Sequence, residues 1–172
     1  SANWDTPQNV TVTGVDDDPI DGDQTSTLTI SILDVVSDDD FDNVPDRTLS
    51  VTTTDDDVAG FTIAETDGST GVDESGSTDL FTVVLNAQPT TDVVLSISSA
   101  DTGEATVTSS LTFTSANWDT AKTVTVTGVD DDIIDGTQTS TITVSIIDGI
   151  SDNAFDAVAD QTVSVTTTDD DV

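Results

Sequence analysis

The chain has 172 residues, of which 35 are acidic and only 2 are basic, so its formal net charge is −33. A negative charge of this size excludes electrostatic binding to nucleic acid or to an anionic membrane surface, and we expect neither as a partner. Histidine, cysteine, methionine and tyrosine are absent, which excludes disulfides, thiolate or imidazole metal sites and Ser-His or Cys-His catalysis, and we expect no enzyme.

Residues 1–58 are expected to form three strands, at residues 9–15, 25–33 and 48–54. In each strand apolar residues alternate with threonine or serine, which is the period of a half-buried β-strand. This alternation argues against the disorder that a very acidic composition would otherwise indicate. Residues 34–47 are expected to form a solvated loop in which Phe41 packs on the core.

Residues 59–114 occur once and are expected to form four strands, at residues 60–66, 78–87, 93–99 and 105–114. Residues 115–172 then repeat residues 1–58 at an offset of 114 positions, with 42 of the 58 aligned residues identical. No segment has a helical period, and no apolar run approaches the length that crosses a membrane. Trp4 and its counterpart Trp118 are expected to be buried anchors.

About seven short strands in a repeat of 114 residues favour an all-β fold, an immunoglobulin-like antiparallel β-sandwich in tandem repeat. We expect residues 59–172 to be one complete sandwich, and residues 1–58 to be the C-terminal half of a preceding repeat. A half sandwich leaves an apolar face uncovered. Residues 1–58 could therefore remain a half module, pair with residues 59–114 as a permuted domain, or be completed by another copy of the chain.

Acidic residues crowd the ends of the expected strands. The run at 129–136, Val-Asp-Asp-Asp-Ile-Ile-Asp-Gly, holds four carboxylates within six residues. Each like-charge pair about 4 Å apart costs roughly 4 kcal/mol at an effective dielectric near 20. Because Arg47 and Lys122 are the only basic side chains, the positive partner is expected to be a divalent cation, and calcium favours such oxygen ligands. The alternative is a solvated acidic surface.

The order of the strands brings four acidic segments to the same end of the sandwich: Glu74, Asp101, the loop after Val129 and the run 169–171. Here the sequence resembles the Calx-beta family of calcium-binding sandwiches, through Val-Asp-Glu-Ser-Gly at 72–76, the run at 129–136 and Asp-Asp-Asp at 169–171. That resemblance implies a set of side-chain ligands together with the carbonyl of Ile133. The implied side chains are Glu74, Asp101, Asp130, Asp131, Asp135, Asp169, Asp170 and Asp171.

The first copy holds an equivalent set of acidic residues, Asp16, Asp17, Asp21, Asp55, Asp56 and Asp57. It lacks counterparts of Glu74 and Asp101, so its site is expected to be poorly occupied unless another segment supplies them.

Near-identical copies rich in threonine and aspartate resemble the extender repeats of giant bacterial adhesins of the repeats-in-toxin type. The resemblance implies a calcium-rigidified spacer on the bacterial cell surface, with several Ca²⁺ ions at module ends and interdomain junctions. Its partners would be the neighbouring identical repeats. Two alternatives are a calcium-dependent ligand-binding adhesin domain and a calcium-sensing regulatory Calx-beta module.

Overall fold

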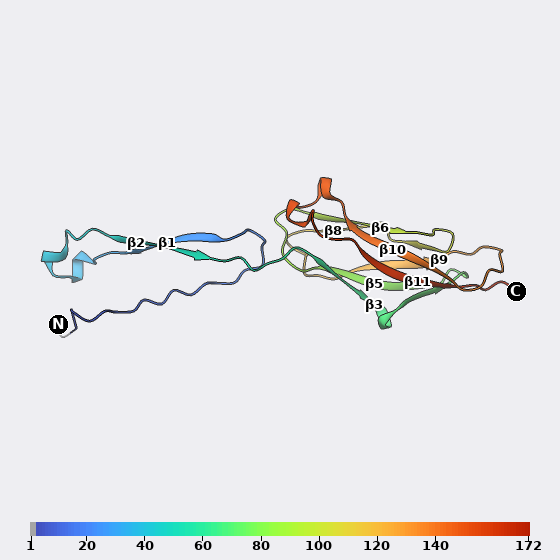
Figure 1. Cartoon of the computed structure of the whole chain (residues 1–172), viewed down its shortest axis with the longest axis horizontal. Coiled ribbons are helices and arrows are strands. Elements are labelled where there is room, and N and C mark those ends of the chain that lie inside the picture. The colour runs from blue at the N-terminus through green and yellow to red at the C-terminus, as the bar shows by residue number, and fades with distance from the viewer. Residues whose placement is uncertain (1–2) are drawn as a thin grey trace. The chain divides into compact units, whose positions relative to one another are not determined.

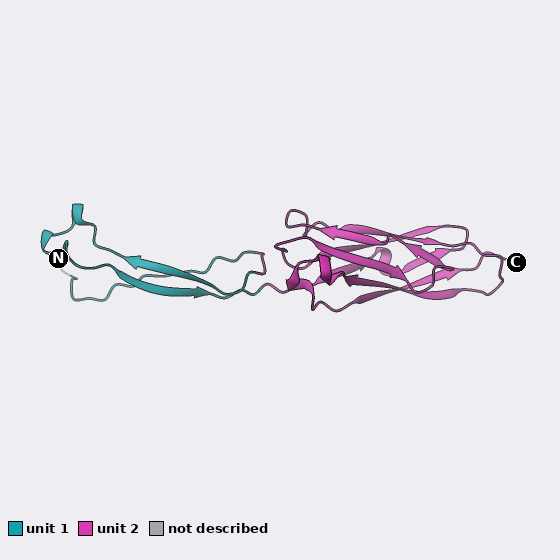
Figure 2. Ribbon diagram, turned by 90° about the horizontal axis from the view of Figure 1, so that it is seen from above, with its two compact units in different colours: residues 1–17, 21–56 teal, residues 18–20, 57–172 magenta. Residues whose placement is uncertain are grey.

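The computed structural model describes residues 3–172, which divide into two compact units (Figure 1). Unit 1 takes in the described residues up to 17 and residues 21–56, and unit 2 takes in residues 18–20 and 57–172 (Figure 2). No helix among the described residues is both long and apolar enough to cross a membrane.

Unit 2 is an immunoglobulin-like sandwich of two sheets, which confirms the fold class predicted from the strand pattern. One sheet has the order β4-β11-β10-β6-β8 and the other the order β3-β5-β9-β7. The strands are β3 (Phe61–Glu65), β4 (Thr70–Asp73), β5 (Thr78–Leu85), β6 (Val93–Ser99), β7 (Ala105–Val107), β8 (Ser110–Phe113), β9 (Lys122–Gly128), β10 (Gln138–Ile146) and β11 (Gln161–Thr168). Three 3-10 helices lie between strands: η3 (Thr66–Gly68), η4 (Asp148–Ile150) and η5 (Asn153–Phe155).

The sandwich differs from the sequence prediction in two respects. The strand expected at 105–114 is divided into β7 and β8, which belong to different sheets. The short strand β4 was not predicted, and it pairs in parallel with β11, whereas the other strand pairs of unit 2 are antiparallel. Residues 59–114 pair with strands of residues 115–172, so the permuted domain is not formed.

The core of unit 2 is built from alternate residues of facing strands, as the period-two pattern requires. On β5 the side chains of Phe81, Val83 and Leu85 are buried, and they meet the buried valines and isoleucines of β9, β10 and β11. Phe155 of η5 is fully buried among them, while Trp118 is half-buried against the same core. Ile20, in the segment 18–20, also packs on this core. The Gln88 N–H donates a hydrogen bond to the Asp18 carbonyl, which ties the same segment to unit 2.

Unit 1 contains only the antiparallel hairpin of β1 (Gln24–Ile30) and β2 (Arg47–Thr53), with η1 (Asp34–Val36) and η2 (Asp39–Phe41) in the connection. The prediction of a strand at residues 9–15 was wrong, since this segment has no regular secondary structure and belongs to no sheet. Its counterpart β9 pairs with β5 and β7, and both of these strands come from residues 59–114. Unit 1 has no equivalent strands, so an almost identical sequence stays outside any sheet.

Two packing predictions for unit 1 were also wrong, for the same reason. Phe41 is 55% exposed and Trp4 is 84% exposed, whereas Phe155, the counterpart of Phe41, is fully buried. An apolar side chain is buried only where a second layer covers it. Unit 1 lacks that layer.

Candidate metal centre

The parallel pairing of β4 with β11 brings two acidic segments together at one end of unit 2. Strands that run in the same direction end at the same edge, so Glu74, which follows β4, comes beside Asp169, which follows β11. The Glu74 N–H donates to the carbonyl of Thr168, the last residue of β11, at 3.1 Å. The backbone thus holds Glu74 beside the end of β11.

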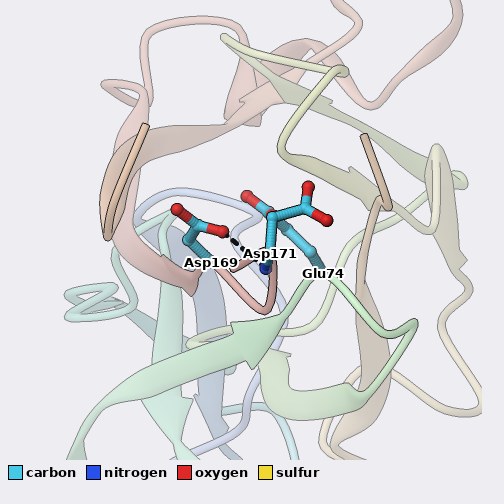
Figure 3. Close-up of side chains that lie close together, drawn as sticks. All are labelled: Glu74, Asp169 and Asp171. Atoms are coloured by element: carbon cyan, nitrogen blue, oxygen red, sulfur yellow. Dashed lines mark hydrogen bonds between the residues drawn. The ribbon is translucent and has the colours of Figure 1, made fainter. Parts of the chain in front are cut away.

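Three carboxylates form a cluster at this edge: Glu74, Asp169 and Asp171 (Figure 3). Each offers one oxygen, and these oxygens lie within 4.8 Å of one another. Calcium binds oxygen at about 2.3–2.6 Å, so two ligand oxygens on one ion are at most about 5 Å apart. The spacing is therefore compatible with a single calcium ion.

Buried oxygens without a hydrogen-bond donor mark the same end of unit 2. Among the described residues, Glu74 Oε2, Asp171 Oδ2 and Glu104 Oε2 are buried and have no hydrogen-bond partner. A buried charged oxygen without a partner is unfavourable, because it has lost its hydration and gained nothing in return. An oxygen-binding cation would supply the missing interaction for each of them.

Lys122, the basic side chain of unit 2, does not supply this charge. Lys122 Nζ donates to the Thr112 carbonyl and lies 5.0 Å from the centre of the Phe113 ring, at the start of β9. The acidic loop follows the other end of β9, after Gly128. Unit 2 contains no other basic side chain, so within unit 2 a cation from solution is the available partner.

The protonation equilibria reflect the crowding of charge. Burial, and then the charges of Asp169 and Asp131, raise the pKa of Glu74 above its usual value. Burial and the charge of Asp135 raise the pKa of Glu104, and burial and the charge of Asp169 raise that of Asp171. Burial and the neighbouring charges thus oppose ionisation of these three carboxyl groups, and a bound cation would favour it.

Asp169 behaves differently from its neighbours. The Asp171 N–H donates to Oδ1 of Asp169 at 2.8 Å (Figure 3). The Gly136 N–H donates to Oδ2 of Asp169 at 2.7 Å, and these two hydrogen bonds lower the pKa of Asp169. Asp169 therefore stays ionised to lower pH than the other members of the cluster.

A close backbone contact holds Glu74 in place. Gly128 ends β9, and a Cβ atom there would collide with the carbonyl group of Asp73. The Gly128 N–H donates to the Ser77 carbonyl at 3.0 Å, while the Asp73 N–H donates to Ser77 Oγ at 2.7 Å. The glycine thus lets β9 approach the turn that carries Glu74.

The structure brings together three of the predicted ligands, Glu74, Asp169 and Asp171, and places the other predicted residues around them. Asp131 is half-buried and its Oδ1 accepts the N–H of Ile133 at 2.7 Å, while Ile133 itself is 60% exposed. Asp101 Oδ1 accepts the N–H of Gly103 at 3.0 Å. The remaining predicted ligands of this copy are exposed: Asp130, Asp135 and Asp170.

Glu104 is the acidic residue that the sequence prediction missed. It stands alone in a Thr-Gly-Glu-Ala stretch, so no cluster of acids drew attention to it. The Val129 N–H donates to its carbonyl at 2.9 Å, which fixes Glu104 beside the acidic loop that begins at 129. Its position three residues after Asp101, in the same loop, was the available signal.

The first copy keeps one part of this arrangement. Asp55 Oδ2 accepts the N–H groups of Gly22 and Asp21, at 2.6 and 3.1 Å, as Asp169 accepts that of Gly136. Asp16, Asp17 and Asp56 are exposed. Asp57 belongs to unit 2, where it lines a shallow pocket with Ile20 and Ala59. Among residues 3–172, the one group of acidic side chains spaced to hold a metal ion is that of Glu74, Asp169 and Asp171.

No protein-family model and no curated protein matches the chain. Solved structures match at low identity: the apo form of the Calx CBD1 domain (16% identity, TM-score 0.45, 64% of this chain and 98% of that one); domains 4 and 5 of the S-layer protein SbsC (20%, 0.47, 84% and 58%); and the E. coli chaperone DraB (9%, 0.47, 67% and 58%). The chain thus spans 58% of the length of the chaperone and of the S-layer fragment. The metal centre rests on the geometry of this chain.

Proposed function

We propose that the chain is part of a non-catalytic, calcium-rigidified extender of an extracellular bacterial adhesin. The observation that carries the proposal is the group of buried carboxylate oxygens without hydrogen-bond donors beside the cluster of Glu74, Asp169 and Asp171. Calcium would bind these oxygens and neutralise the end of the module. The other predicted acids, including Asp101, Asp130, Asp131, Asp135 and Asp170, would hold further ions or lower the local potential.

The tandem repeat supports a mechanical role. Each copy ends its last strand in the same Thr-Thr-Thr-Asp-Asp-Asp-Val sequence, at 52–58 and at 166–172. The residues that bind the ion would therefore also be the residues that lead from one module to the next. A bound ion would restrict the backbone there, and many equivalent copies would add length without changing the ligand that the adhesin holds.

The test is thermal unfolding of the chain in excess chelator and in increasing calcium, with magnesium as the control. Binding to the folded state alone raises the free energy of unfolding by about 2.7 kcal/mol per site at a hundredfold excess over the dissociation constant. Extracellular modules bind calcium at about 10⁻⁴–10⁻³ M, so we expect the rise in this range. An unchanged melting temperature at about 10 mM calcium would reject the calcium site.

A second measurement tests the mechanical role. In a protein of several repeats, small-angle scattering should give a longer maximum dimension with calcium than with chelator. If calcium raised the melting temperature but left this dimension unchanged, the site would be structural without stiffening the array. A large change within a single module would instead favour a calcium sensor.

A further inference from the structure

Unit 1 exposes a set of apolar side chains, here called its apolar face, whose counterparts in unit 2 are buried. Five of these side chains are between 49% and 68% exposed, and each has a fully or almost fully buried counterpart in unit 2. The exposed residues are Val10, Val12, Ile30, Phe41 and Leu49, and the buried counterparts are Val124, Val126, Val144, Phe155 and Val163.

The counterparts in unit 2 are covered by strands from residues 59–114. Strand β9 pairs with β5 and β7, and β10 pairs with β6, where Val144 lies opposite Ile97. Strand β4 pairs in parallel with β11, on the side of β11 away from β10. Every strand that joins the repeated half to the rest of the sandwich therefore comes from this one segment of the chain.

We propose that the apolar face of unit 1 is a docking surface for the first half of a repeat, a polypeptide segment with the sequence of residues 59–114 that is not the one held in unit 2. The internal repeat identifies the occupant. Residues 115–172 share 42 of 58 residues with residues 1–58, and in unit 2 they pair with this segment. The docked segment would add strands to residues 9–15 and to β1. It would thereby bury the five exposed side chains.

The chain's own residues 59–114 are poorly placed for this role. In unit 2 the Gln161 side chain donates to the Phe61 carbonyl at 2.6 Å, so β11 begins near Phe61 and ends at Thr168, seven residues and about 23 Å further on. Thr54 is the counterpart of Thr168, and only seven residue steps separate it from Phe61. At about 3.3–3.6 Å per residue, the connection would have to be fully extended along the module.

The number of halves leads to the same conclusion. The chain holds two copies of the second half but one copy of the first half, which already pairs with residues 115–172. Transfer of that segment to unit 1, within one chain or between two chains, would uncover one apolar face for each face that it covers. The burial of apolar area would not increase, so such an exchange has no hydrophobic driving force. A separate first half does not have this cost.

The experiment adds an unlabelled polypeptide of residues 59–114 to the full chain in a buffer of fixed calcium concentration. Hydrogen exchange, measured by mass spectrometry on the full chain, should slow at least tenfold at residues 9–15 and 24–30, with saturation at one polypeptide per chain. Residues 122–128 should be unchanged. Slower exchange only in residues 115–172, or no saturable effect, would overturn the proposal.

Two variants of β1 make the test specific. Ile30→Asp places a charge on the proposed surface and should weaken binding at least tenfold. Thr27→Asp is the matched control, because its counterpart Thr141 stays exposed in unit 2, and it should bind as the unaltered chain does. Equal binding by both variants would overturn the proposal, as would dimerisation of the chain that protects residues 9–15 without added polypeptide.

A covalent form removes any dependence on the solubility of the free segment. A second copy of residues 59–114 is joined ahead of residue 1, and exchange at residues 9–15 is compared with that of residues 123–129 in the same molecule. Equal protection of the two segments supports the proposal. Rapid exchange at residues 9–15 in this form would contradict it, and this readout does not depend on whether calcium binds.

Discussion

The backbone N–H of Gly136 donates a 2.7 Å hydrogen bond to Oδ2 of Asp169, and Gly22 makes the same contact with Asp55 in unit 1 at 2.6 Å. Both glycines have a φ of +73°, which residues with a side chain rarely adopt. The turn forms in a complete sandwich and in an open hairpin alike. The turn therefore does not require residues 59–114, whereas Glu74 and Glu104 are supplied by that segment.

Substitution of Gly128 should damage both the fold and the metal centre. In Gly128→Ala the new Cβ meets the carbonyl of Asp73, so the turn that carries Glu74 must move. We expect a loss of about 1–3 kcal/mol in the free energy of unfolding of unit 2, together with weaker calcium binding. Chemical denaturation and calcium titration measure the two effects.

Gly14→Ala is the matched control, because Gly14 is the counterpart of Gly128. A Cβ at Gly14 would make only an ordinary contact with Thr53, at 3.5 Å. We expect a change within about 0.5 kcal/mol. A similar loss for both variants would show that the contact between Gly128 and Asp73 is unimportant.

Removal of one negative charge from the cluster should have opposite effects with and without calcium. In chelator, Glu74→Gln relieves repulsion by Asp169 and Asp131, so the melting temperature should rise. In calcium, the same variant lacks a charged ligand and should bind the ion at least tenfold more weakly. Glu104→Gln should follow the same pattern if its buried oxygen is a ligand.

Asp160→Asn is the control for charge alone, because Asp160 is exposed and directly precedes β11 at the edge away from the cluster. It should leave the calcium affinity unchanged. If Glu74→Gln lowered the melting temperature in chelator, the repulsion argument would be wrong.

The pH dependence of stability should reverse when calcium is bound. Without calcium, the raised pKa values of Glu74 and Glu104 mean that the folded state binds protons more tightly than the unfolded chain, whose glutamates titrate near 4.5. Stability should therefore increase as the pH falls from neutral towards 4.5. With calcium, acidification protonates the ligands and releases the ion, so stability should fall.

Below this range the calcium-free protein should lose stability again. Burial acts to raise the pKa of Asp152, but hydrogen bonds from Ala154, Thr90 and Thr91 outweigh it, so the pKa lies below the usual 3.8. The stability that this carboxylate contributes is lost as the pH falls through its folded pKa. Melting temperatures between pH 3 and 7 test both signs, and parallel curves with and without calcium would contradict the account.

The paired phenylalanines test the packing difference between the two copies. Phe155→Ala removes a fully buried ring and should cost about 3–5 kcal/mol in the free energy of unfolding. Phe41 is 55% exposed, so Phe41→Ala should change stability by less than about 0.5 kcal/mol. Denaturant titration of both variants measures the difference, and a large loss for Phe41→Ala would mean that unit 1 is covered in solution.

The sandwich could be predicted from the sequence because alternation of apolar and hydroxyl residues is a local signal. The strand at residues 9–15 could not be predicted correctly, because its alternation is the same as that of β9 and only the partner strands differ. Pairing depends on both strands, and the alternation pattern of one strand does not show whether a partner strand is present.

The metal centre was predictable in part for a related reason. Asp169 and Asp171 stood out as a run of acids, and Glu74 stood out within a family-like motif. Glu104 did not, since its importance comes from burial and from the contact of its carbonyl with Val129, and neither is visible in a single acidic residue. The parallel pairing that aligns Glu74 with Asp169 was likewise outside the pattern.

The most direct test of the calcium site is an anomalous difference map from crystals of the protein grown in calcium, collected at a long wavelength. The account predicts a peak bounded by the carboxylates of Glu74, Asp169 and Asp171, within about 2.3–2.6 Å of one oxygen from each. No peak among these three side chains at millimolar calcium would contradict it.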